Sequence, residues 1–281
     1  MSYKWHILTL IGHAMFAEYL EKLRASGRRH FTSDNLIKDL GISAVAARSG
    51  LYRLKKDAKL ISPISGLYVI VPPEYRPYGS IPAEELVPIM MKHLQAEYYV
   101  ALLSAANYFG AAHQKSARFQ VISNKRIKHS LKFGQIAIEL IYKNSLTNLP
   151  TQDFTVSTGY LKVATPELIA IDLFKYAKRA AGISHIATIL SELTCSIDGN
   201  KLIKLAENMD EICQIQRLGY VIEKIDVMDE NKKQSIINTL AEYLQNSGRP
   251  FVSLVPYILR KGYPKCRKWK VIENTDFESD L

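Results

Sequence analysis

Hydrophobic and polar positions change their spacing in a fixed order over roughly the first seventy residues. Apolar residues recur at helical spacing over residues 8–25, 33–40 and 43–59. Two short apolar runs then flank Ser65-Gly66 within residues 60–70. This order predicts three helices followed by a β-hairpin.

The residues between these helices favour sharp helix boundaries. Thr32 or Ser33 can cap the second predicted helix, and Gly41 permits a tight turn after it. Ser43 can cap the third helix. Two helices joined by a short turn and followed by a hairpin predict a winged helix-turn-helix over residues 1–72, a DNA-binding fold.

The predicted third helix has two unlike sides. A helical wheel places an apolar side against the other helices, formed by Ala44, Ala47, Leu51, Leu54 and Ala58. The first turns of a recognition helix face base edges, which gives as candidate base contacts Ser43, Val45, Arg48, Ser49 and Tyr52. The candidate phosphate contacts are Lys55, Lys56 and Lys59, and the turn Ser65-Gly66 can reach the adjacent groove.

The charge of the chain supports a phosphate-rich partner for this region. Residues 1–80 hold 12 Lys and Arg against 6 Asp and Glu, whereas residues 81–281 hold 25 against 21. A winged helix that binds another protein, with a solvated basic face, remains an alternative. An inverted-repeat DNA site would take two copies about one helical turn apart.

The rest of the chain predicts a larger mixed α/β domain. Prolines at residues 73–82 predict a linker, residues 83–272 a C-terminal domain, and residues 273–281 a flexible acidic tail. The patterns predict helices at 83–94, 98–109, 165–181, 184–194, 199–207, 211–225 and 230–246. They predict strands at 118–123, 135–142, 154–156, 160–163, 251–254 and 269–272, so the fold class is α+β.

No catalytic, metal or cofactor motif is present in the sequence. The glycines form neither a phosphate loop nor a dinucleotide fingerprint, and the histidines and three cysteines lack metal-ligand spacing. Glu139 and Lys143 are the nearest approach to a nuclease site, but positions four apart on a strand are about 13 Å apart. We expect them to be an exposed pair without a catalytic role.

The hydropathy of the chain predicts a cytoplasmic protein without a membrane partner. No run approaches the about 20 apolar residues of a membrane span, and the first residues lack the features of a signal peptide.

Four stretches together resemble a known family. They are residues 98–114, 157–168, 217–220 and 268–271, which read YYVALLSAANYFGAAHQ, STGYLKVATPEL, RLGY and KWKV. In this order and spacing they resemble the AbiEi antitoxins of bacterial abortive-infection toxin-antitoxin systems. The resemblance implies a DNA-binding first domain that represses its own promoter. It also implies a second domain that counteracts a nucleotidyltransferase-like toxin, without requiring a stable complex.

The family supplies no catalytic residues to carry over, and it implies that basic patches of the second domain serve neutralisation. The densest such cluster is Lys115, Arg118, Lys125, Arg126 and Lys128. A solvated loop or additional DNA contacts are alternatives for this cluster. For the whole chain, a stand-alone winged-helix regulator with a ligand-sensing or oligomerising C-terminal domain remains an alternative, and a nucleic-acid-processing enzyme is a third.

Overall fold

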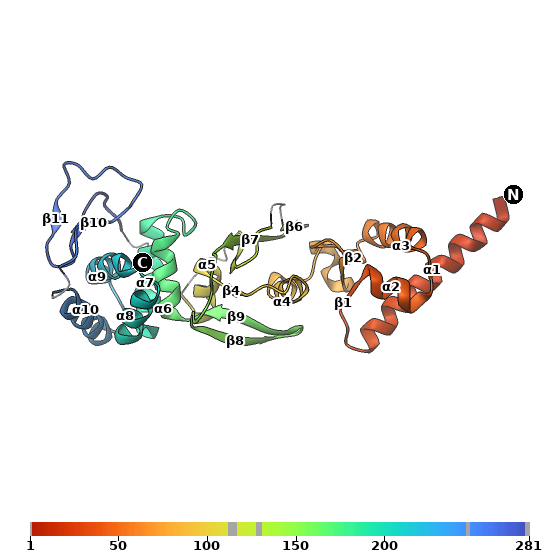
Figure 1. The fold of residues 1–281 in the computed structure, drawn as a ribbon, viewed down its shortest axis with the longest axis horizontal. Coiled ribbons are helices and arrows are strands. Elements are labelled where there is room, and N and C mark those ends of the chain that lie inside the picture. The colour runs from red at the N-terminus through yellow and green to blue at the C-terminus, as the bar shows by residue number, and fades with distance from the viewer. Residues whose placement is uncertain (1, 112–116, 128–130, 246–247, 279–281) are drawn as a thin grey trace. The chain divides into compact units, whose positions relative to one another are not determined.

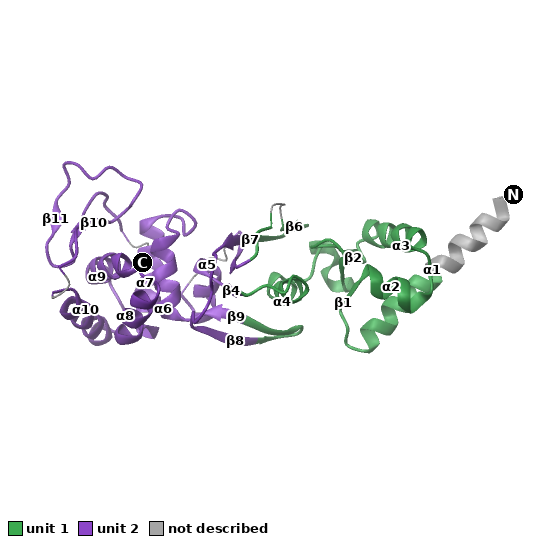
Figure 2. Ribbon diagram, in the orientation of Figure 1, with its two compact units in different colours: residues 1–97, 125–139, 155–161 green, residues 98–124, 140–154, 162–281 purple. Residues whose placement is uncertain are grey.

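The computed structural model has an α+β fold divided into two units (Figure 2). It describes residues 2–111, 117–127, 131–245 and 248–278, with side chains from residue 14 onward. Unit 1 comprises residues 1–97, 125–139 and 155–161; unit 2 comprises residues 98–124, 140–154 and 162–281. Among the described helices, none has both the length and the apolar character of a transmembrane span.

The first part of unit 1 alternates helices with short strands (Figure 1). Its elements are α1 (Ser2–Ala25), β1 (His30–Thr32), α2 (Ser33–Leu40), α3 (Ala44–Lys56), β2 (Leu60–Ile61), β3 (Leu67–Ile70), η1 (Pro73–Tyr78) and α4 (Ala83–His93). The strands form an antiparallel sheet in the order β1-β3-β2. β1, which the hydrophobic pattern did not indicate, therefore extends the predicted hairpin.

Local side chains set the ends of α2 as the sequence predicts. Thr32 accepts a hydrogen bond from the Asn35 backbone N–H, and the Asn35 side chain accepts one from the Thr32 N–H. At the other end, Gly41 has a φ of 61°, a left-handed conformation that favours glycine. The two caps confine α2 to eight residues.

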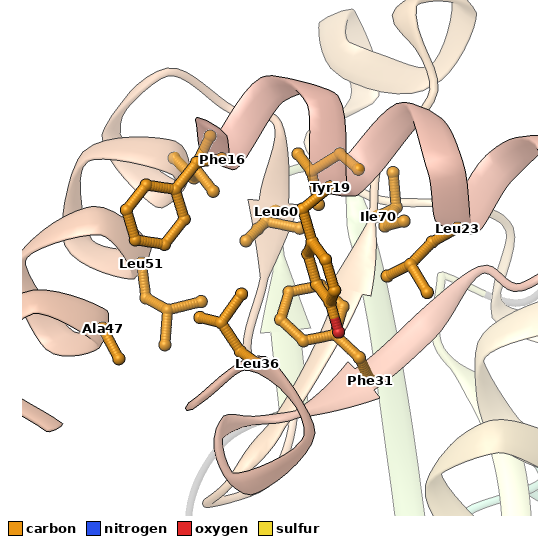
Figure 3. Packing of buried hydrophobic residues seen from close by; sticks show 11 residues of the cluster. Phe16, Tyr19, Leu23, Phe31, Leu36, Ala47, Leu51, Leu60 and Ile70 are labelled. Atoms are coloured by element: carbon orange, nitrogen blue, oxygen red, sulfur yellow. The ribbon is translucent and has the colours of Figure 1, made fainter. Parts of the chain in front are cut away.

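One apolar cluster joins the helices and strands of this region (Figure 3). Phe16, Tyr19 and Leu23 of α1 meet Leu36 of α2 and Leu51 of α3. Gly50 of α3 lies directly against the Phe16 ring, where an added Cβ would overlap the ring carbons. This close approach fixes how α3 lies on α1.

A six-stranded sheet has the order β6-β7-β5-β4-β9-β8. Its strands are β4 (Tyr98–Val100), β5 (Phe119–Ser123), β6 (Leu131–Phe133), β7 (Ile136–Tyr142), β8 (Thr151–Val156) and β9 (Gly159–Ala164). β4 pairs antiparallel with β5 and parallel with β9. The predicted strands at 135–142 and 160–163 are confirmed, and that at 154–156 is longer than predicted.

Helices of unit 2 follow β9. They are α6 (Pro166–Lys175), α7 (Ile183–Leu193), α8 (Gly199–Asn208), α9 (Ile212–Lys224) and α10 (Glu230–Gln245), with η3 (Thr194–Ser196) after α7. The chain ends in a small sheet of β10 (Val252–Ser253), β12 (Val271–Ile272) and β11 (Lys265–Cys266), in that order. α6 is shorter than the predicted helix at 165–181, because the chain turns at Tyr176.

The prediction of a single helix over residues 98–109 is wrong. β4 occupies its start, and only α5 (Leu102–Ala106) and η2 (Asn107–Phe109) are helical. Tyr99 and Val100 are buried and pair with Ile122 and Val121 of β5. A short apolar run fits a buried strand as well as a helix, so its periodicity could not decide between them.

The structure is ordered at two places that the sequence predicts to be irregular, the linker and the acidic tail. In the predicted linker, η1 forms and Ile81 is fully buried. In the predicted tail, Asn274 is buried and its amide donates to the carbonyls of Val255 and Ile258. The division of the chain at residues 73–82 stays a prediction, because the two units interleave along the sequence.

We expect Gly50→Ala to lower the free energy of unfolding by about 1–3 kcal/mol, because the new methyl group overlaps the Phe16 ring. Urea denaturation measures this change. The exposed neighbour provides the control, since Ser49→Ala should change stability by less than about 0.5 kcal/mol. Phe16→Leu in the Gly50→Ala background should restore part of the loss; additive losses would show that the two residues are not coupled.

Candidate nucleic-acid interface

The outward side of α3 presents most of the predicted contact residues together. Val45 and Tyr52 are 71% and 66% exposed, which is unusual for apolar and aromatic side chains. Further exposed positions on this side are Ser43, Arg48, Ser49, Lys55 and Lys56. Ser43 also caps the helix, because its side chain accepts a hydrogen bond from the Ala46 N–H.

The inward side of α3 explains this exposure. Ala47, Leu51 and Leu54 are buried as predicted, and Gly50 joins them. Ala44 is exposed, so its predicted burial is wrong: it lies in the first turn, beyond the reach of the cluster. Ala58 is outside the helix and has a φ of 53°.

α3 carries only positive charge. Its cations are Arg48, Arg53, Lys55 and Lys56, and its sequence contains no Asp or Glu. Arg53, which the wheel did not select, donates from Nε to the Ser49 carbonyl, 3.3 Å away. A helix with this composition attracts anions along its exposed side.

Lys59 and the hairpin turn lie outside α3. Lys59 follows the helix end, and its Nζ is 3.8 Å from the Asp57 carboxylate, which partly neutralises it. Gly66 has a φ of 78°, and Ser65 is exposed. The Ser65 carbonyl lies 3.3 Å from Nε2 of His93 on α4, so the turn is held within unit 1.

The second predicted basic cluster stays a prediction, because the structure describes only three of its residues. Lys115 and Lys128 lie outside the described residues. Arg118 precedes β5, whereas Lys125 and Arg126 follow it. Arg118 belongs to unit 2, whereas Lys125 and Arg126 belong to unit 1.

Lys143 is not the exposed residue that the sequence predicts, because its Nζ atom is buried in unit 2. The charge of fully buried Asp172 acts on it. The Tyr99 hydroxyl donates to Oδ2 of Asp172 at 2.8 Å. Sequence patterns did not predict this polar centre of Tyr99, Lys143 and Asp172, because its residues come from β4, from the position after β7 and from α6.

Burial controls protonation in the polar centre. It raises the pKa of Asp172 to about 6, although the positive charge of Lys143 opposes this shift. Burial also lowers the pKa of Lys143 and raises that of Tyr99. Lys143 Nζ and Asp172 Oδ1 have no hydrogen-bond partner among the described residues. Because the Asp172 side chain is fully enclosed, the centre is a structural core feature.

The described residues contain no group of three or more His, Cys, Asp and Glu side chains that could hold a metal ion.

The fold is α+β, and one segment of the chain matches a known domain family. Residues 99–224 match the family model of the AbiEi antitoxin C-terminal domain. The resemblance to AbiEi-type antitoxins is therefore confirmed, and this domain indicates an antitoxin role in a toxin-antitoxin system.

A similar fold occurs in a solved structure, described as the crystal structure of RV2827C protein from Mycobacterium tuberculosis. The two chains are 14% identical, and the similarity covers 91% of this chain and 90% of the other with a TM-score of 0.63. At this identity the likeness concerns the fold alone. Comparison with curated proteins gives no match.

We expect Tyr99→Phe to lower the free energy of unfolding by about 1.5–3 kcal/mol at pH 8, because the Asp172 carboxylate loses its hydrogen-bond donor. The loss should shrink below pH 6, where the folded protein already protonates Asp172. Denaturation at pH 8 and pH 5 measures both values. The exposed Tyr263→Phe should show neither effect; an equal loss at both pH values would contradict a charged Asp172.

For Asp172 itself, the pKa in the folded state lies above the ordinary value of 3.8. Its contribution to stability is therefore most favourable at low pH and declines as the pH rises to about 6.

Proposed function

We propose that residues 1–72 are a winged helix-turn-helix that binds double-stranded DNA. The observation that carries this proposal is the exposed, carboxylate-free side of α3, whose opposite side is packed on Phe16 and Leu36. The short α2–α3 turn and the following β1-β3-β2 sheet support the same assignment. In this arrangement α3 enters the major groove.

The proposed contacts divide by their position along α3. The first turns, with Ser43, Val45, Arg48, Ser49 and Tyr52, face base edges. Lys55 and Lys56 lie in the last turn and neutralise phosphates. Lys59 contributes less to phosphate binding, because the Asp57 carboxylate lies 3.8 Å from its Nζ atom. The turn Ser65-Gly66 lies at the edge of the proposed interface.

We further propose that the chain is a non-enzymatic cytoplasmic antitoxin that represses its own promoter at inverted repeats. The matched domain in residues 99–224 supports the antitoxin role. The resemblance supports a nucleotidyltransferase-like toxin as the partner. The antitoxin would counteract the effect of this toxin without forming a stable complex with it. The competing proposal is a stand-alone regulator, which would have no toxin to oppose.

DNA binding can be tested on duplexes from the chain's own promoter. We expect Arg48→Ala to weaken promoter binding by about 1–3 kcal/mol and to reduce sequence preference. Lys55→Ala should weaken binding to every duplex and lower the salt slope by about 0.9. Fluorescence anisotropy at several salt concentrations measures both. Lys204→Ala, an exposed lysine of α8, removes the same charge elsewhere; equal weakening by this control would argue against α3.

The antitoxin role can be tested separately from DNA binding. Cells expressing the adjacent toxin gene from an independent promoter should stop growing, and the full chain should restore growth. The double variant Arg48→Ala/Lys55→Ala should restore growth equally but fail to repress a promoter reporter. If the neighbouring gene is harmless, the stand-alone regulator is the better proposal; if the double variant cannot rescue, the two activities are not separate.

A further inference from the structure

A basic and aromatic hollow lies in unit 2 where α6 ends. Its volume is about 300 Å³, at the lower end of the range for small-molecule sites. Lys175, Tyr176, Lys178 and Arg179 line one side, and Pro256 and Tyr257 line the other. The hollow thus joins two segments that are about eighty residues apart in the sequence.

The aromatic and basic side chains of the hollow fit a nucleotide whose base is unpaired. Tyr257 is 50% exposed, and Lys178 Nζ lies 4.7 Å from the centre of its ring. Lys178 has no carboxylate partner within the described part of the chain. Lys175, in contrast, is paired with Glu211. Tyr257 stays half exposed although the Lys178 ammonium group lies over its ring, so the pair can provide base stacking and phosphate binding together.

Buried hydrogen bonds hold both sides of the hollow in place. The Asn274 amide donates to the carbonyls of Val255 and Ile258, which fixes the loop that carries Tyr257. The buried Gln120 amide donates to the Arg179 carbonyl at 3.0 Å. The hollow is therefore preorganised by side chains that do not line it.

A strongly basic segment continues from the hollow. Residues 249–270 contain seven Lys and Arg and no Asp or Glu. Arg260 and Lys261 follow Tyr257 closely and are exposed. Further along, the ammonium groups of Lys265 and Lys270 lie 5.4 and 5.5 Å from the Phe251 ring centre. Aromatic side chains are interspersed among the basic ones here, a combination also found in grooves that bind nucleic-acid single strands.

We propose that unit 2 binds single-stranded nucleic acid at this hollow, with a base stacked on Tyr257 and the strand's phosphates on Lys178, Arg260 and Lys261. A single strand fits better than a duplex, because only unpaired bases offer a face to a tyrosine ring. The site uses no residue of α3 and is independent of duplex binding by unit 1.

The test uses a fluorescein-labelled 12-nucleotide oligouridylate and the full chain carrying Arg48→Ala and Lys55→Ala, so that α3 contributes little. In this background, Tyr257→Ala should weaken binding about tenfold, whereas Tyr257→Phe should bind unchanged because it keeps the ring. Lys178→Ala should lower the salt slope by about 0.7. Lys204→Ala is the matched charge control. Thermal unfolding verifies that each variant is folded.

Three outcomes would overturn the proposal. Tyr257→Ala could bind the oligonucleotide as tightly as the parent, or Lys204→Ala could weaken binding as much as Lys178→Ala, which would indicate general charge attraction. Lastly, an unlabelled duplex of equal length could compete as well as the single strand. A failure here leaves the duplex assay on the promoter unaffected, since that assay concerns α3.

Discussion

The contact between the Phe16 ring and the backbone of α3 at Gly50 sets the orientation of the helix on which the DNA-binding proposal depends. Only glycine leaves room for the ring, so α3 can approach α1 closely on the side that carries Gly50. The same side of α3 contributes three residues to the core, which are Ala47, Leu51 and Leu54. The opposite side, with its cations and Tyr52, is consequently turned to solvent.

Unit 2 contains a similar contact between an aromatic ring and a helix glycine near its C-terminal end. The Trp269 ring is fully buried against Gly219 of α9, where a Cβ would overlap it. Beside it, Gln216 donates to the carbonyls of Pro250 and Lys270, and Arg217 donates to the Ser253 carbonyl. These bonds tie the backbone of the small sheet and of the segment before it to α9. The basic segment is thereby attached to a helix and presents its charges outward.

Several features of unit 2 could not be predicted from the sequence, for physical reasons. The run at residues 98–100 is a strand because partners on β5 and β9 bury it, and those partners are distant along the chain. Lys143 is enclosed beside Asp172, whereas a local pattern suggested an exposed lysine. The burial of a side chain depends on helices and strands that are distant in the sequence. The residues next to it in the chain therefore do not reveal whether it is buried.

By itself the sequence determined what depends on local chemistry. The period of apolar residues placed α2, α3 and most helices of unit 2, and the caps at Thr32 and Gly41 are encoded within a few residues. It also determined the charge of α3. The tertiary structure alone decided that Ala44 is exposed and that residues 174–179 meet Tyr257 around one hollow. Such contacts join segments far apart in the chain, so packing, not local propensity, selects them.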